Sequence, residues 1–278
     1  MSAFSSANFN SEGYAQFRPN YDDSLFDFIH NYHTGESKLA VDIGCGSGQA
    51  AYPLSTYFDK VIGTDLSAKM IETANKKVSG DYVDKLEFRV SPAEELGFLA
   101  DNSVDLITAA QCIHWFNHTK FFKEVARVLK PGGTLAFWGY ADPVFNDVVA
   151  DKMAMDFTYD DPTKLGPYWE QPGRDLLRNL LKDVNAPDEL FDQKKTWERR
   201  PGVSGDSPLE IKRQIPLEYY SHYVKTWSSY HRWKEAHQNQ EDISDIYIKQ
   251  LQAKMGWTPK TVVNIEWLTV LKLAKRRL

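Results

Sequence analysis

The sequence has few cysteines and no long apolar run. Its 278 residues include two cysteines, Cys45 and Cys112. Two thiols are too few for a disulfide framework or a four-ligand zinc site, so we expect free thiols in a reducing compartment. No stretch of about 18 consecutive apolar residues is present, which argues against a membrane span. Residues 1–17 lack the regions of a secretory signal, and a cytoplasmic protein is therefore expected.

An excess of basic charge is also missing. The net charge is −5 at neutral pH, and phosphate binding along a nucleic acid requires a basic field. We therefore expect no nucleic-acid partner, although one or two local cations would suffice for a small anion. Hydrophobic residues make up 42% of the chain, enough for a sizeable core, and general disorder is excluded. Nothing here fixes the oligomeric state, and a monomer is favoured.

Strand and helix patterns alternate through the first half of the chain. Five short apolar segments, at 39–43, 61–65, 86–90, 104–110 and 135–138, alternate with helical patterns that include 25–32, 67–78 and 121–129. Such alternation predicts a βαβ arrangement with a parallel sheet buried on both faces. We assign residues 1–140 to a doubly wound α/β core of Rossmann-like type, with residues 1–20 as an N-terminal lid.

The second half of the chain has a different pattern. Residues 142–175 are irregular and rich in Pro, Gly and aromatic residues, and 215–255 predict two helices, one of them running through Tyr219 and Tyr230. Residues 262–270 predict a final strand that returns to the sheet. We therefore interpret 141–260 as insertions that form an acceptor-binding cap on the core, and 261–278 as a C-terminal strand of that core.

The most informative motif is the octet VDIGCGSG at 41–48. Its glycines, Gly44, Gly46 and Gly48, let the backbone turn sharply and approach a ligand. The dinucleotide fingerprint requires a further glycine at position 49, which is Gln49, and this disfavours a nicotinamide oxidoreductase. Asp42 beside the loop would repel a pyrophosphate but suits the ammonium group of S-adenosylmethionine.

Other strand ends supply further candidate cofactor contacts. Asp65 ends the second strand, the position where an acid accepts both ribose hydroxyls. Ala93 and Glu94 follow the third strand, where we expect the adenine. Gln111, His114 and Trp115 follow the fourth strand and should face the methyl group, since ligand crevices form at the carboxyl ends of parallel strands.

These residues carry a resemblance to a known family. VDIGCGSG, TDLSAKM at 64–70 and QCIHWF at 111–116 resemble the class I S-adenosylmethionine-dependent methyltransferases of the type 11 group. Four further segments, at 9–21, 138–145, 166–174 and 225–234, resemble the fungal trans-aconitate methyltransferases over nearly the whole chain. The resemblance implies a seven-stranded sheet with an antiparallel last strand. It also implies formation of a methyl ester on a small di- or tricarboxylic acid, with S-adenosylhomocysteine as the second product.

Candidate residues follow from this chemistry. Methyl transfer to a carboxylate requires alignment and a holder for the acid, and it requires no general base because the acid is already ionised. We assign His114 and Trp115 to the catalytic site, with His114 as a hydrogen-bond donor to the acid. The candidates for substrate binding are Arg18, Tyr140, Tyr168, Trp169, Arg174, Trp227 and Tyr230, extended by His231 and Arg232. The candidates for cofactor binding are Tyr14, Asp42, Gly44, Gly46, Gly48, Asp65, Leu66, Met70, Ala93, Glu94 and Gln111; no metal site is expected.

Two alternatives remain open at this point. The acceptor could be a phenol, a thiol, a lipid or a drug-like acid, and an acceptor that must lose a proton would need His114 as a base. The chain could also be a non-catalytic protein that retains the cofactor pocket and serves a partner.

Overall fold

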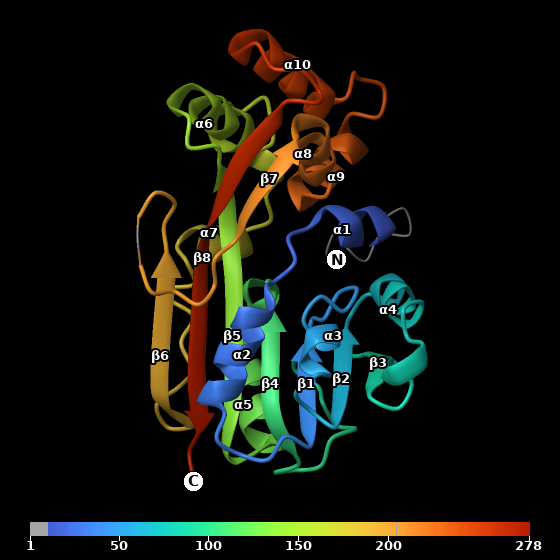
Figure 1. Ribbon diagram of the computed structural model, residues 1–278, viewed down its shortest axis with the longest axis vertical. Helices are drawn as coiled ribbons and strands as arrows, with labels where there is room; N and C mark the ends of the chain where they lie inside the picture. Colours follow the sequence, from blue (N-terminus) through green and yellow to red (C-terminus); the bar gives the residue numbers. More distant parts are fainter. Residues whose placement is uncertain (1–10, 204) are drawn as a thin grey trace.

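Figure 1 shows a computed structural model that describes residues 11–203 and 205–278. The strands are β1 (Leu39–Ile43), β2 (Lys60–Asp65), β3 (Leu86–Val90), β4 (Val104–Ala110), β5 (Leu129–Val144), β6 (Phe191–Arg199), β7 (Lys212–Pro216) and β8 (Val262–Arg276). The α-helices are α1 (Ser11–Phe17), α2 (Asp23–Tyr32), α3 (Ala51–Leu54), α4 (Ala68–Asn75), α5 (His118–Val128), α6 (Val148–Met155), α7 (Gly173–Arg178), α8 (Leu217–Val224), α9 (Ser228–Ala236) and α10 (Ile243–Met255).

The strands of the described residues form one mixed sheet. Its order is β3-β2-β1-β4-β5-β8-β6, and β7 also pairs with β8. The first five strands pair in parallel, and β8 runs antiparallel to β5, β6 and β7. The predicted α/β class and the antiparallel last strand are thus confirmed. The sheet has eight strands where seven were expected, because β6 and β7 pair with different parts of one long β8.

Both faces of the parallel strands are covered by helices. Successive residues of β1 belong to different apolar clusters: Ala40 packs with Phe26 of α2 on one face, and Val41 packs with Phe121 of α5 on the other. The near-continuous apolar strands seen in the sequence follow from this two-sided burial. The predicted helix that starts after Ser67 is also present, and the Ser67 side chain caps it by accepting from the backbone N–H of Met70.

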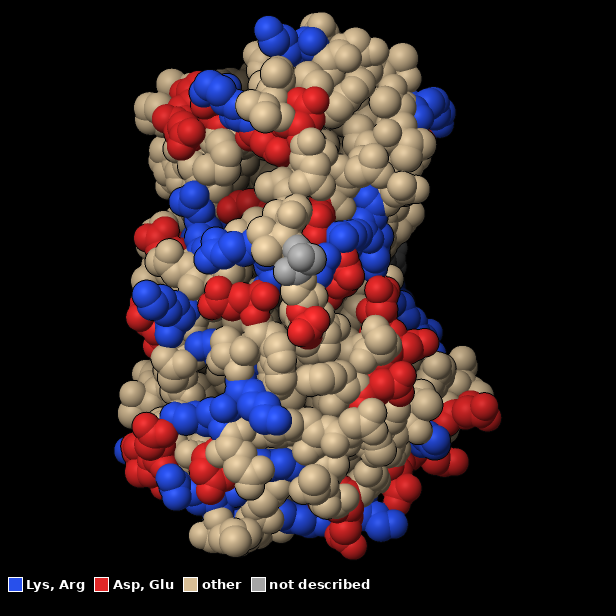
Figure 2. Space-filling model, turned by 60° about the vertical axis from the view of Figure 1, so that its left-hand side comes forward, with Lys and Arg blue, Asp and Glu red and all other residues tan. Residues whose placement is uncertain are grey.

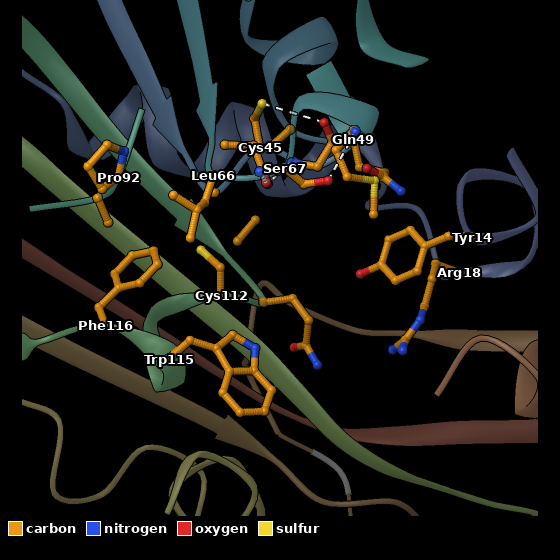
Figure 3. Close-up of a pocket in the computed structure, with 18 of the residues that line it drawn as sticks. Tyr14, Arg18, Cys45, Gln49, Leu66, Ser67, Pro92, Cys112, Trp115 and Phe116 are labelled. Carbon is orange, nitrogen blue, oxygen red and sulfur yellow. Dashed lines mark hydrogen bonds between the residues drawn. The ribbon is translucent and has the colours of Figure 1, made fainter. Parts of the chain in front are cut away.

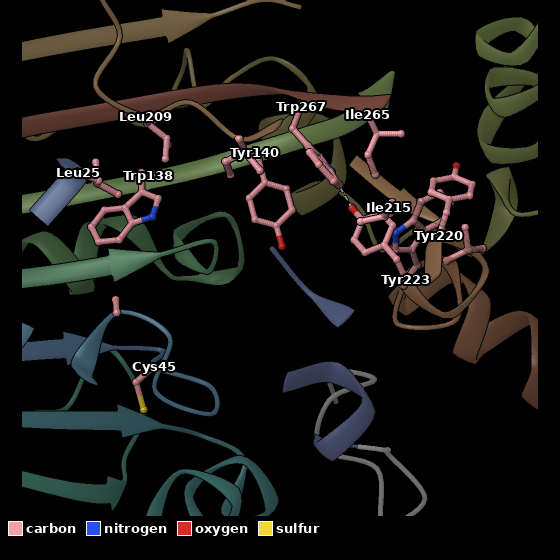
Figure 4. Close-up of a cluster of buried hydrophobic side chains, with 14 of the residues drawn as sticks. Leu25, Cys45, Trp138, Tyr140, Leu209, Ile215, Tyr220, Tyr223, Ile265 and Trp267 are labelled. Carbon is pink, nitrogen blue, oxygen red and sulfur yellow. Dashed lines mark hydrogen bonds between the residues drawn. The ribbon is translucent and has the colours of Figure 1, made fainter. Parts of the chain in front are cut away.

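Two long strands connect the core to the helices at the other end of the molecule. Strands β5 and β8 continue past the parallel sheet, where Tyr140 and Val144 pair with Thr269 and Glu266. Helices α6, α8, α9 and α10 gather around these extensions (Figure 1). A cluster of buried aromatic side chains fixes them there: Trp267 of β8 donates from its indole N–H to the Tyr223 hydroxyl of α8 at 2.9 Å (Figure 4).

Two details differ from the sequence-based expectation. Residues 141–260 contain β6 and β7 and the end of β5, so this segment completes the sheet in addition to carrying the helices expected of a cap. The single helix expected through Tyr219 and Tyr230 is two helices, α8 and α9. The Thr226 hydroxyl donates to the Tyr223 carbonyl at 2.6 Å, and Trp227 is extended with ψ of 141°. A side chain that bonds to the local backbone in this way competes with the helix.

Acidic and basic side chains are interspersed on the face seen in Figure 2. Ion pairs between such side chains include that of Arg199 with Glu210 at 2.7 Å. Within residues 11–203 and 205–278, no helix combines the length and the apolar character that a bilayer crossing requires.

The close packing of β2 against β3 gives a test of the core. A β-carbon built on Gly63 would lie 2.5 Å from the Phe88 ring and 3.0 Å from the Cys45 Sγ. We expect Gly63→Ala to lower the free energy of unfolding by about 1–3 kcal/mol, as overpacking of a core does. Urea denaturation measures this change. Gly97→Ala is the matched control, because no atom lies within 4 Å of the added carbon; equal effects of both variants would contradict the packing argument.

Candidate active site

A cavity of about 340 Å³ opens at the carboxyl ends of β1, β2 and β4 (Figure 3). This volume falls within the roughly 300–1,000 Å³ that is typical of small-molecule sites. Segments that are far apart in the sequence line this large cavity: α1 and its following turn, the glycine loop, the ends of β2 and β3, the loop after β4, Tyr140 of β5, and Glu170 before α7. Its lining includes Tyr14, Arg18, Tyr21, Gly44, Gly46, Gln49, Asp65, Leu66, Ser67, Met70, Ser91, Ala93, Glu94, Gln111, Cys112, Trp115, Phe116, Tyr140 and Glu170.

A second, narrow cavity of about 40 Å³ adjoins the first. We call it the branch. The two cavities share the side chains of Tyr14, Arg18, Gln111, Trp115 and Tyr140. The branch continues between β5, α7 and the α8–α9 turn, where it is lined by His114, Asp142, Trp169, Arg174, Tyr223, Trp227 and Ser228. Because a water molecule occupies about 30 Å³ in the liquid, the branch has room for one small functional group.

The glycine loop turns its backbone toward the large cavity. Gly44 and Gly46 have positive φ angles of 66° and 55°, a region that favours glycine. A β-carbon on Gly44 would lie 2.7 Å from the Cys112 Sγ, while one on Gly46 would lie at an ordinary contact distance of 3.5 Å from the Gln49 Oε1. Gly48 does not line the cavity, contrary to our expectation, and a β-carbon there would collide with the Tyr52 ring at 2.7 Å. Packing against Tyr52 accounts for this third glycine.

Asp65 lies on the cavity wall at the end of β2. Its two carboxylate oxygens accept from the backbone N–H groups of Gly46 at 2.9 Å and Ser67 at 2.8 Å. Burial raises the pKa of Asp65, and these two hydrogen bonds oppose the rise. The predicted position of an acid at this strand end is therefore present, fixed by the glycine loop on one side and by the start of α4 on the other.

Asp42 occupies a different place from the one that the sequence suggested. Its side chain is fully buried, accepts from the Thr108 hydroxyl at 2.7 Å, and is absent from the described cavity lining. Burial raises its pKa to about 7, although the hydrogen bond from Thr108 acts in the opposite direction. Since Thr108 belongs to the neighbouring β4, Asp42 ties two strands together beneath the loop. The sequence predicts that Asp42 meets the cofactor ammonium directly or through water, and the structure places its side chain outside the described lining of the cavity.

The remaining candidates for cofactor binding all line the large cavity: Tyr14, Leu66, Met70, Ala93, Glu94 and Gln111. Glu94 accepts from the backbone N–H of Asn117 at 2.7 Å, which fixes it beside the loop after β4. Gln111 has a positive φ of 57°, and its side-chain amide forms two hydrogen bonds with the backbone of Tyr140, at 2.6 and 2.9 Å. Gln111 thereby attaches the loop after β4 to β5.

Arg18 is a cation without an acidic partner in the described residues. Its Nη2 donates to the Thr226 carbonyl at 3.0 Å and its Nη1 to the Tyr140 hydroxyl at 3.4 Å. Its Nε is buried and has no hydrogen-bond partner in the described chain. The guanidinium also lies 4.9 Å from the ring centre of Tyr14. Because Arg18 lines both cavities, an uncompensated positive charge stands at their junction.

Arg174 differs from Arg18 in its partners. It forms an ion pair with Asp142 and donates from its Nε to the Tyr159 hydroxyl at 2.6 Å. It also stacks on Trp169, at 3.9 Å from the ring centre. Asp142 receives a second cation, since the Arg178 Nε lies 3.6 Å from its other oxygen. Arg174 thus lines the branch as expected, with its charge largely compensated.

His114 lies in the branch as an uncharged imidazole. Burial, the guanidinium of Arg174 and that of Arg18 lower its pKa to about 3. Its Nδ1 is buried and has no hydrogen-bond partner in the described residues. Such a low pKa makes His114 a weak base, while the neutral ring can still donate one hydrogen bond.

The other acceptor candidates divide into two groups. Trp115, Tyr140, Trp169 and Trp227 line the branch. Tyr168 and Tyr230 line neither cavity among the described residues: the Tyr230 hydroxyl donates to Asp242 at 2.6 Å, and the Tyr168 hydroxyl lies 3.5 Å from His237. His231 and Arg232 are absent from both linings as well.

Several residues that line the cavities were not among the candidates predicted from the sequence. Ser67 and Ser91 follow strand ends next to the residues that were chosen, so their positions were available from the pattern. Asp142 lies in the part of β5 that extends beyond the predicted strand at 135–138. Tyr223 and Glu170 come from segments whose path relative to the sheet is set by tertiary packing.

The comparisons with known proteins agree with this geometry. A methyltransferase-domain family model matches residues 41–137. A probable S-adenosylmethionine-dependent methyltransferase of Saccharomyces cerevisiae is 32% identical over 97% of this chain and 97% of its own length. The chain belongs to the S-adenosylmethionine-dependent methyltransferases. A putative methyltransferase of Dictyostelium discoideum is 34% identical over 79% of this chain and 75% of its own.

Solved structures show the same fold for this methyltransferase. The structure of a putative type II methyltransferase from Anaeromyxobacter dehalogenans has 26% identity and a TM-score of 0.71, covering 93% of this chain and 98% of that one. A phosphoethanolamine N-methyltransferase of Haemonchus contortus shares the fold at 15% identity and a TM-score of 0.54, covering 99% of this chain and 60% of that one.

The buried neutral His114 of this methyltransferase has a consequence for stability. Its pKa is about 3 in the folded state and about 6.5 in the unfolded chain. Below about pH 6.5 the unfolded state binds a proton that the folded state does not, so stability falls as the pH is lowered, by up to about 1.4 kcal/mol per pH unit. We expect His114→Asn to lose less stability than the wild type between about pH 6.5 and 4. Urea denaturation across this range tests it, and parallel profiles would contradict the lowered pKa.

Proposed function

We propose that this methyltransferase forms a methyl ester on a small di- or tricarboxylic acid of the trans-aconitate type. The observation that carries the proposal is Arg18, a half-buried arginine without an acidic partner in the described residues, at the junction of the two cavities. A guanidinium binds a planar carboxylate through two parallel hydrogen bonds. The acceptor acid would supply the missing negative charge.

The large cavity has the features that S-adenosylmethionine requires, and this cofactor supplies an electrophilic methyl group when it is bound. The backbone of Gly44 and Gly46 offers close approach without side chains. We assign Asp65 to the ribose hydroxyls and Ala93 and Glu94 to the adenine. Leu66 and Met70 would pack against the nucleoside, and Tyr14 of α1 would cover the junction. We retain the proposal that the segment before α2 acts as a lid; residues 1–10 lie outside the described residues.

His114 supports a carboxylate over an acceptor that must be deprotonated. A carboxylate is ionised at neutral pH and needs no base, whereas a phenol or a thiol would require one. With a pKa of about 3, His114 is too weak a base for that task. We assign its free Nδ1 to donation toward the acid, with Trp115 as a wall of the reacting space. Arg174 would then position the acid without adding a net charge, because Asp142 already pairs with it.

A radiolabel assay tests the proposal. The enzyme is incubated with methyl-labelled S-adenosylmethionine and a panel of mono-, di- and tricarboxylic acids that includes trans-aconitate. Transfer that is labile to alkali would support a carboxyl methyltransferase. Transfer only to phenols or thiols would refute the proposed acceptor class. Cofactor binding without transfer to any acceptor would favour the non-catalytic alternative.

The same assay tests Arg18. We expect Arg18→Gln to raise the KM for the acid roughly 10²-fold, since removing one partner of a buried charge pair costs about 2–5 kcal/mol. Arg18→Lys should have an intermediate effect, because it keeps the charge but not the paired donors. Arg200→Gln on the exposed surface is the control. An unchanged KM for Arg18→Gln would exclude Arg18 as the holder of the acid.

A further inference from the structure

We propose that Glu170 is a specificity-determining residue that favours the positively charged cofactor over its neutral product, S-adenosylhomocysteine. The proposal rests on the cofactor of the family and holds for any acceptor. Glu170 comes from the segment before α7, outside the parallel strands, and its negative charge would attract the positive charge of the cofactor.

Glu170 lies on the wall of the large cavity, beside its junction with the branch. It lines the large cavity, while its neighbour Trp169 and the nearby Arg174 line the branch. The backbone N–H of Arg174 donates to the Glu170 carbonyl at 3.0 Å, so the two residues share one turn. That turn packs on Trp115, which lines both cavities: a β-carbon on Gly173 would lie 2.7 Å from the Trp115 ring.

The other acids on the cavity wall have different positions. Among the described lining residues the carboxylates are Asp65, Glu94 and Glu170. Asp65 is held by the glycine loop and the start of α4, and Glu94 is held by Asn117 before α5. Asp42 is buried against Thr108, away from the wall. Glu170 is therefore the acid that the described lining of the large cavity provides beside the junction.

The transferable methyl group must reach the junction, because an acceptor in the branch meets the large cavity there. The sulfur that carries this methyl group is positively charged. Transfer to an acceptor oxygen breaks the carbon–sulfur bond, leaves its electron pair on sulfur and forms the oxygen–carbon bond. Transfer therefore removes the positive charge of the cofactor. A Coulomb attraction to Glu170 that would stabilise bound S-adenosylmethionine is absent for S-adenosylhomocysteine.

The surrounding charges make the role of Glu170 specific. Arg18 faces the junction without an acidic partner in the described chain, and Arg232 of α9 pairs with Glu170 through one carboxylate oxygen. Without Glu170, Arg18 and Arg232 would both lack an acidic partner in the described residues, since Asp142 of the branch already pairs with Arg174. Their positive charges would oppose binding of the positively charged cofactor. With Glu170 present, S-adenosylhomocysteine binds more weakly than S-adenosylmethionine, because it no longer carries the positive charge that the carboxylate attracts.

Binding measurements test the proposal without an acceptor. We expect Glu170→Gln to weaken S-adenosylmethionine about tenfold and to change the affinity for S-adenosylhomocysteine less than about twofold, since only the first ligand carries the charge. Isothermal titration calorimetry with each ligand gives both affinities, and thermal unfolding checks that the variant folds. Equal weakening of both ligands, or no change in either, would overturn the proposal.

Variants of Arg232 provide the matched control. Arg232→Gln removes the partner but keeps the carboxylate, so the preference for S-adenosylmethionine should persist or increase. In the double variant, S-adenosylmethionine should bind more weakly than in Arg232→Gln alone. If the double variant instead recovered wild-type affinity, release of Arg232 would explain the loss and Glu170 would have no direct role. Because no acceptor is present, these outcomes are independent of whether the enzyme methylates a carboxylic acid.

Discussion

The parallel pairing of β1 with β2 and β4 is the constraint on which the rest of the structure depends. Parallel strands that are buried on both faces end at the same edge of the sheet, and every polar residue that follows such a strand is delivered to that edge. The glycine loop, Asp65 and Gln111 reach one cavity for this reason. Hydrogen bonds between these elements then fix them, since Asp65 accepts from Gly46 and the Gln111 amide bonds to the backbone of Tyr140.

The antiparallel pair β5–β8 supports the branch of the site, which is lined by residues of β5. Both strands extend beyond the parallel sheet, so side chains of Tyr140 and Asp142 stand above the cavity edge. The buried aromatic side chains around Trp267 hold α8 against this extension, and the α8–α9 turn then presents the Thr226 carbonyl to Arg18. The position of Arg18 thus depends on three segments: the one after α1, β5 and the α8–α9 turn.

Charged residues of the same type differ in this site by whether a residue of opposite charge pairs with them. Arg18 and Arg174 are both half-buried arginines on the branch, yet Arg174 has Asp142 and Arg18 has no acid in the described chain. Leaving a buried charge unpaired is costly, so a protein that retains one gains most when a ligand of opposite sign completes the pair. The acids differ as well: Glu170 on the wall of the large cavity pairs with Arg232, whereas Asp42 is buried beneath the loop and accepts from Thr108 through one oxygen.

The sequence by itself determined the α/β core, the helix cap at Ser67, the acid at the end of β2 and the glycine loop, because each is a local pattern of burial and turn formation. It also indicated the residues after β3 and β4, since parallel strands bring such positions together. Only the tertiary structure decided that Asp42 and Gly48 face the core, that Tyr168 and Tyr230 lie away from the cavities, and that Glu170 and Asp142 belong to the site. The physical reason is that local patterns specify whether a side chain is buried, whereas the partner of a buried charge is chosen by distant segments meeting in the fold.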